Sequence, residues 1–148
     1  MTTLPEALSS ADKKETVVDD CLQLIDAEVA DKGGISGLAL KAGYSAVKGI
    51  KPGFIRGVVG DLLPEFAVAL EPFYQEAVEK KKKPSEHFVA NGPRVADALL
   101  SITDARAKTA KSGVVRSTYD KLRGSAKKNV EQALPRLGKL VEKHTPAT

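Results

Sequence analysis

Residues 17–27 read Val17-Val18-Asp19-Asp20-Cys21-Leu22-Gln23-Leu24-Ile25-Asp26-Ala27, and residues 95–105 repeat the pattern as Val95-Ala96-Asp97-Ala98-Leu99-Leu100-Ser101-Ile102-Thr103-Asp104-Ala105. Both stretches contain Val-x-Asp, a Leu five residues after the Val, and a final Asp-Ala. Their apolar residues recur at steps of three and four, which is the spacing of one helical face. The pattern therefore predicts two related amphipathic helices.

The similarity continues beyond these helices in an unchanged order. Three later motifs have counterparts: Ser36-Gly37 with Ser112-Gly113, Tyr44–Gly49 with Tyr119–Gly124, and Leu63-Pro64 with Leu134-Pro135. The offset shrinks from 78 to 75 to 71 residues, which two small deletions would explain. Short matches of common helix residues also arise by chance, but conserved order favours a duplication into halves at about 10–80 and 85–145.

Composition and length fit one domain covering residues 1–148. The chain is 42% apolar and 28% charged, as is typical of a globular protein with a core of its own. It has no run of about 18 apolar residues and no secretory leader pattern, so a cytoplasmic protein is expected. The single cysteine, Cys21, cannot form an internal disulfide and is expected to be buried and inert.

The predicted fold is an all-α bundle of about six main helices, three in each half. No run alternates in the way that strands do. The expected helices cover about 12–31, 36–50, 53–80, 93–111 and 115–144, with a short helix from Ser85. Two points stay open, because Pro64 could divide the third helix and Gly124 could break the last one. The tail 145–148 is expected to fray.

Two faces in the first half carry specific expectations. The apolar face of the helix over 36–50 is assigned to Leu38, Ala39, Ala42, Ala46, Val47 and Ile50. The inner side of the next helix is assigned to Phe54, Val58, Leu62, Leu63, Phe66, Leu70, Phe73 and Ala77. Eight of the 12 glycines lie between 33 and 60, and Gly49, Gly53 and Gly57 step by four. This spacing favours close helix packing, with a basic segment on an anionic membrane as the alternative.

Aspartates recur at the edge of the repeated helices. Asp19 and Asp26 are seven residues apart, as are Asp97 and Asp104. Such carboxylates could bind a metal or act as acid–base pairs, but pairing with a nearby tyrosine or base is favoured. The expected structural network comprises Asp19, Asp26, Tyr44, Lys48, Asp97, Asp104, Tyr119 and Arg123. Within it, Asp26 is expected to meet Tyr44 or Lys48, and Asp104 to meet Tyr119 or Arg123.

Basic residues concentrate in the second half. Residues 1–75 hold 7 basic and 11 acidic side chains, whereas residues 76–148 hold 16 and 8. The densest run is 106–128, and its candidate anion- or partner-binding residues are Arg116, Arg123, Lys127 and Lys128. A solvated helix face is the competing interpretation, and only Tyr119 accompanies the run, so stacking on nucleic-acid bases is not supported.

No familiar catalytic motif is present. The sequence lacks a nucleophile elbow, a phosphate-binding glycine loop and a dinucleotide fingerprint. His87 and His144 have no zinc-ligand spacing, and His87 is expected to be a partly exposed surface residue. Nothing therefore argues for an enzyme, a metal or a cofactor.

Three further motifs carry a family resemblance: Asp31-Lys32-Gly33-Gly34-Ile35-Ser36-Gly37, Lys51-Pro52-Gly53 and Ala133-Leu134-Pro135-Arg136-Leu137-Gly138. Together they resemble a family of small all-α actinobacterial proteins described only as a domain of unknown function. The resemblance implies an actinobacterial, cytoplasmic protein, and it brings no activity, ligand or site residue.

The resulting expectation is a non-enzymatic helical binding or scaffold protein. Its contact surface is placed in the cleft between the halves, near the Gly-rich helix and the basic run 106–128. The alternative is an electrostatic binder of nucleic acid or an anionic membrane through that run. An enzyme whose site leaves no sequence signature is the third possibility. Partner identity and oligomeric state are not predicted.

Overall fold

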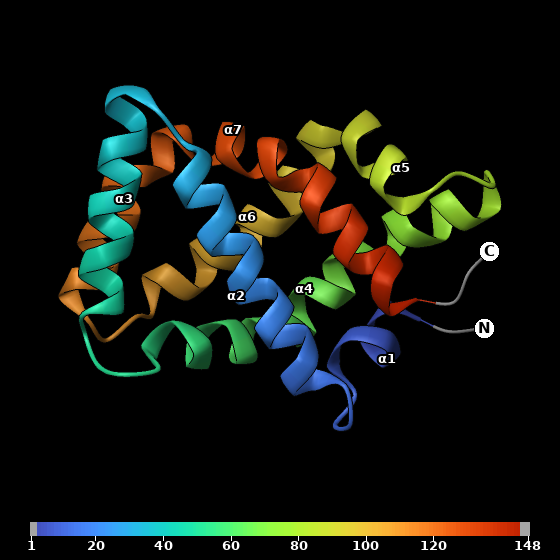
Figure 1. The fold of residues 1–148 in the computed structure, drawn as a ribbon, viewed down its shortest axis with the longest axis horizontal. Helices are drawn as coiled ribbons and strands as arrows, with labels where there is room; N and C mark the ends of the chain where they lie inside the picture. Colours follow the sequence, from blue (N-terminus) through green and yellow to red (C-terminus); the bar gives the residue numbers. More distant parts are fainter. Residues whose placement is uncertain (1–2, 146–148) are drawn as a thin grey trace.

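Helices account for most of the chain. The computed structural model describes residues 3–145, and within them it contains seven helices and no strand (Figure 1). The helices are α1 (Leu4–Ser9), α2 (Lys14–Asp31), α3 (Gly34–Lys48), α4 (Phe54–Glu79), α5 (Pro84–Ala90), α6 (Gly92–Lys108) and α7 (Gly113–His144). The all-α prediction is confirmed. The expected fraying concerns the tail 145–148, of which residues 146–148 lie outside the described part of the chain.

The long helices α4 and α7 run through their internal prolines. α4 contains Pro64 and Pro72, and α7 contains Pro135. Pro64 therefore does not divide α4 into two helices. Each proline removes one backbone hydrogen bond, and burial of the neighbouring Leu63 and Leu134 supplies compensating packing.

The two parts of the chain differ in the lengths and places of their helices. The first contains α2, α3 and α4, whereas the second contains the short helix α5, then α6 and the single long helix α7, which passes Gly124 without a break. The connection over 49–53 contains Pro52 and the left-handed Gly53, with φ of 74°. The residues after Gly124 are Ser125-Ala126-Lys127, which tolerate a helix well. Two equivalent three-helix halves are not shown, and the internal repeat stays a prediction from the sequence.

The hydrophobic core occupies one side of the bundle. It is formed by α1, the start of α2, the second half of α4, α5, the start of α6 and the end of α7. Among the residues with described burial, only Gly37 is buried between 19 and 61, and none is buried between 101 and 133. The bundle therefore has a densely packed region and a thinly packed region that contains α3 and the first halves of α4 and α7.

The apolar stripe assigned to the inside of α3 faces outward instead. Leu38, Ala39, Ala42 and Ala46 are exposed, so this expectation was wrong for most of the stripe. α3 packs on α2, α4 and α7 through its other side, which presents Tyr44 and Val47. Because α3 has apolar residues on both sides, the periodicity alone does not decide which side faces the bundle.

Close backbone approach occurs at glycines other than the expected series. A Cβ added to Gly57 would meet no atom within 4 Å, and Gly53 lies in the turn before α4. By contrast, a Cβ on Gly43 would lie 2.8 Å from Thr118 Cγ2, and one on Gly138 would lie 2.2 Å from the Cα atom of Ser85. The tight contacts are therefore between α3 and α7 and between α5 and α7.

The Gly138 contact yields a stability prediction. Gly138→Ala should lower the free energy of unfolding by about 2 kcal/mol or more, because the new methyl group meets the backbone of α5 and forces the helices apart. Gly124→Ala is the matched control in the same helix. It meets nothing within 4 Å and should gain up to about 1 kcal/mol. Urea unfolding measures both, and equal effects at the two positions would contradict the assignment.

Candidate functional site

A tyrosine–aspartate pair joins α3 to α2. The Tyr44 hydroxyl donates to Asp26 Oδ1 at 2.6 Å, and Lys48 Nζ lies 5.1 Å from the centre of the Tyr44 ring. Partial burial and the bond to Asp26 raise the pKa of Tyr44, so the phenol stays protonated and donating. The structure thus brings together Asp26, Tyr44 and Lys48, and the pairing holds α3 on the bundle.

A corresponding group joins α6 to α7. The Tyr119 hydroxyl donates to Asp104, and Arg123 donates to both oxygens of that carboxylate, at 2.8 and 3.2 Å. The bonds from Arg123 and Tyr119 hold the pKa of Asp104 below its ordinary value. The Tyr119 oxygen also lies 2.7 Å from Thr103 Oγ1. This carboxylate is ionised and engaged, so the group fastens two helices.

The other two repeated aspartates also find basic partners. Asp19 pairs with Arg56 of α4, and Asp97 pairs with Lys127 of α7 at 3.1 Å. Each aspartate of the first set thus has a counterpart with an equivalent kind of partner in the second set. Groups that neutralise one another between helices have little capacity left for acid–base chemistry.

Internal contacts engage much of the basic run 106–128. Arg106 donates twice to Glu65, at 2.8 and 3.0 Å, while Arg123 and Lys127 pair with aspartates as described above. Arg116 donates to the carbonyl of Ala110. Of the candidate anion-binding residues, Lys128 is exposed and has no ion pair among the described residues. The run is therefore less available to phosphates than its sequence indicates.

Both histidines contact carboxylates, and the single cysteine, Cys21, is partly buried. His87 is only 2% exposed, with Nε2 at 2.9 Å from Glu76 Oε1, so the expectation of a surface histidine was wrong. His144 is in the last turn of α7, and its Nε2 atom lies 2.6 Å from Oδ2 of Asp20 in α2. Burial, with a smaller contribution from the Asp20 charge, raises the pKa of Cys21 to about 11, which leaves the thiol protonated and unreactive at neutral pH.

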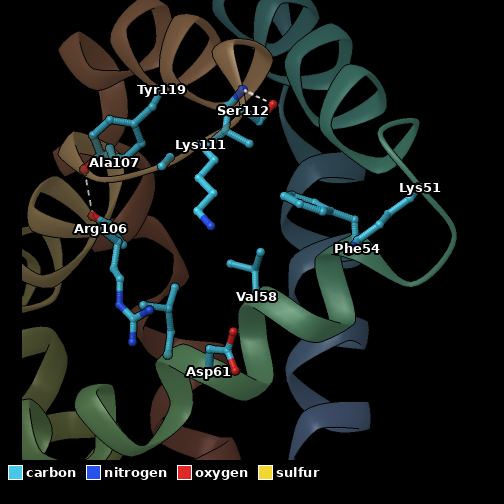
Figure 2. A pocket seen from close by; sticks show the side chains of 13 residues that line it. Lys51, Phe54, Val58, Asp61, Arg106, Ala107, Lys111, Ser112 and Tyr119 are labelled. Atoms are coloured by element: carbon cyan, nitrogen blue, oxygen red, sulfur yellow. Dashed lines mark hydrogen bonds between the residues drawn. The ribbon is translucent and has the colours of Figure 1, made fainter.

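A cavity of about 500 Å³ lies in the thinly packed region, between α4 and the α6–α7 corner (Figure 2). Its apolar lining consists of Phe54, Val58 and Leu62 from α4, and Ala107, Ala110 and Val115 from the corner. The ring of Phe54 points into this space. Pockets of this size and character accept small organic molecules. Of the inner-side residues expected for α4, the first three therefore line a cavity, whereas Leu63, Leu70 and Phe73 lie in the dense core as expected.

The polar groups around this cavity fall into two kinds. Tyr119 and Arg106 are engaged, by Asp104 and Glu65 respectively. Lys51, Asp61 and Lys111 are exposed and form no ion pair among residues 3–145, and the Lys111 side chain extends into the open space (Figure 2). Sequence reasoning missed Lys51, Asp61 and Lys111 as lining residues. The only signal for them was the expected cleft between the Gly-rich segment and the basic run.

The described residues contain neither a cluster of metal-binding side chains nor a membrane-spanning helix. No three His, Cys, Asp or Glu side chains there come close enough to hold a metal ion. None of the described helices is both long enough and apolar enough to cross a bilayer.

Comparison with known proteins yields one match. The model of a family of unknown function (DUF6918) matches residues 4–145. The comparisons with curated proteins and with solved structures gave no match. The resemblance to a family of unknown function is thus confirmed, while actinobacterial origin stays an expectation.

The Asp104 cluster yields a pH prediction. At neutral pH, Asp104→Asn should cost about 1 kcal/mol of unfolding free energy or less, since solvent screens a pair that is 36% exposed at the carboxylate. The folded pKa is lowered, so the stabilisation is present above the ordinary value of 3.8 and is lost as the pH falls through the folded pKa. Urea unfolding at about pH 7 and about pH 2 measures the difference.

The matched control for this experiment is Asp120→Asn, which alters an exposed aspartate on the same helix as Arg123. It should leave the free energy of unfolding within about 0.5 kcal/mol of the parent at both pH values. A cost for Asp104→Asn that is the same at low and neutral pH would contradict an ionic origin.

Proposed function

This chain belongs to that family of unknown function, and we propose that it is a non-enzymatic binding protein whose cavity between α4 and the α6–α7 corner takes an apolar small molecule. The cavity itself carries the proposal. It offers about 500 Å³ of mostly apolar space beside a region where few side chains are buried, outside the dense core of the bundle. An empty cavity costs the protein packing contacts. A ligand that fills the cavity restores these contacts and stabilises the folded state.

The charges at the rim define the chemistry of the ligand. Lys51 and Lys111 place ammonium groups beside the apolar walls, and Asp61 is the acid among the lining residues. A molecule with an apolar body and one anionic group satisfies both features, because its body fills the cavity while its anion meets the lysines. Medium-chain carboxylates and aromatic carboxylates belong to this class.

The chemistry of the lining supports binding over catalysis. Burial and the bond to Asp104 raise the pKa of Tyr119, so its hydroxyl stays protonated at neutral pH and is not available as a general base. Arg106 is tied to Glu65, and Ser112 accepts a bond from the backbone of Val115 as the cap of α7. A nucleophilic hydroxyl needs an adjacent base, and the hydrogen bond of Ser112 does not supply one.

Electrostatic binding through residues 106–128 has less support. Arg106, Arg123 and Lys127 are neutralised by carboxylates, and extracting them would leave those carboxylates unpaired. A salt titration with mixed-sequence DNA tests this second candidate. Binding that weakens steeply with salt, and that is lost in Lys128→Gln, would favour it over the cavity.

Decanoate and decanol test the cavity, because they differ only in the head group. Displacement of a bound anilinonaphthalene sulfonate dye reports the affinity of each. We expect Ala107→Trp, which fills the cavity, to weaken both ligands by about tenfold or more. Lys111→Met should weaken decanoate by up to about fivefold and leave decanol unchanged, because it removes one partly solvated charge.

Ala105→Trp is the matched control for the filling variant. Ala105 is exposed on the same helix, so the new indole should stay in solvent and leave both affinities unchanged. Cooperative urea unfolding in every variant separates loss of the cavity from loss of the fold. Equal behaviour of the Ala105 and Ala107 variants would disprove ligand binding in the cavity.

A further inference from the structure

Helix α3 stands at one end of the long axis of the molecule, and α5 lies toward the other end (Figure 1). The outer side of α3 carries an exposed apolar stripe formed by Ile35, Leu38, Ala39, Ala42 and Ala46. Ile35 is 89% exposed and Leu38 is 68% exposed, the two highest values among the exposed large apolar residues. Steps of three and four place all five residues on one face.

The opposite side of α3 fixes the direction of this stripe. The Tyr44 hydroxyl bonds to Asp26 of α2, and Gly43 lies so close to α7 that an added Cβ would clash with Thr118 and Leu122. The helix is therefore held from behind by a hydrogen bond and a close contact. Its outward apolar face is a consequence of this anchoring.

The charges on α3 itself and on the segment that follows it have one sign. No acidic residue occurs between Lys32 and Gly60. Lys41 lines a shallow hollow at the start of α3 together with Ile35 and Leu38, and Lys48 is the exposed last residue of the helix. Lysines beside an exposed apolar face are the composition of helices that lie in the interface of an anionic bilayer.

We propose that α3 is the surface through which this protein docks on an anionic lipid bilayer. Ile35 and Leu38 enter the boundary between head groups and acyl chains, and the alanines let the helix axis lie close to the head groups. Lys41 reaches the lipid phosphates from the flank of the helix, while Lys48, which lies over the Tyr44 ring, adds positive charge at the end of α3. This docking is independent of the cavity, which is lined by other residues.

A second copy of the chain fits this surface less well. A helix of 15 residues is about 22 Å long, and its stripe offers far less than the roughly 800 Å² per partner that stable interfaces bury. Two copies meeting through α3 would also bring identical lysines together. A bilayer requires neither a large patch nor a complementary shape.

Vesicle sedimentation tests the proposal. The full chain is mixed with vesicles of phosphatidylcholine plus phosphatidylglycerol, and in parallel with vesicles of phosphatidylcholine alone. We expect binding to the anionic vesicles that weakens with added salt, and at least about tenfold weaker binding to the neutral ones. Absence of binding, or equal binding to both compositions, would overturn the proposal.

Variants locate the contact on α3. Ile35→Ser with Leu38→Ser should reduce vesicle affinity at least about tenfold, and Lys41→Gln should reduce it by a smaller factor that vanishes at high salt. Val68→Ser with Val89→Ser is the matched control, because these valines are 62% and 51% exposed on α4 and α5. All these positions are exposed, so the fold should tolerate the changes, and circular dichroism checks it.

Three further outcomes would contradict the assignment. Equal losses in the α3 pair and the valine pair would indicate nonspecific adsorption. A concentration-dependent dimer that the α3 pair abolishes would identify a second copy as the occupant. Decanoate affinity should stay unchanged in the α3 pair, and if it fell with vesicle affinity, the two sites would not be separate.

Discussion

The contact between α5 and α7 at Gly138 is the constraint on which the arrangement of the bundle depends. Only a glycine allows the α7 backbone to approach Ser85 so closely. This approach fixes the end of α7, and α7 in turn packs on α1, α2, α3, α5 and α6. Because α7 is 32 residues long, this one helix connects the dense core with the thinly packed region at the other end of the bundle. Helix α3 and the α6–α7 corner take their places from the other end of that same helix.

Much of the fold could be predicted from the sequence because helix signals are local. Apolar spacing and helix-breaking residues defined α2, α4 and α6 to within a few residues. The tyrosine–aspartate pairs could be expected as well, since each group recurs in the same order in both parts of the chain. Asp26 with Tyr44 and Asp104 with Tyr119 then follow from the tendency of a carboxylate near a core to bond to a nearby donor.

The direction in which α3 faces could not be predicted, because it depends on contacts that are distant in sequence. Leu38 and Ala42 form a regular stripe, but Gly43 decides the orientation by its approach to Thr118. The cavity was beyond sequence reasoning for a similar reason. Phe54 and Val58 look like core residues in sequence, and whether a partner fills the space before them depends on how the α6–α7 corner turns. The burial of His87 likewise depends on contacts distant in sequence, because α5 packs on α4 and α7.

Uneven packing gives the two regions of the molecule different freedom to vary. A substitution in the dense core removes contacts from several helices at once, so selection for foldability constrains Phe88, Leu134 and their neighbours. Most substitutions between 19 and 61 or between 101 and 133 meet few buried contacts, apart from those at Gly43 and at the tyrosine–aspartate groups. The cavity lining and the outer face of α3 can therefore change in sequence at a lower cost in folding free energy than the dense core can.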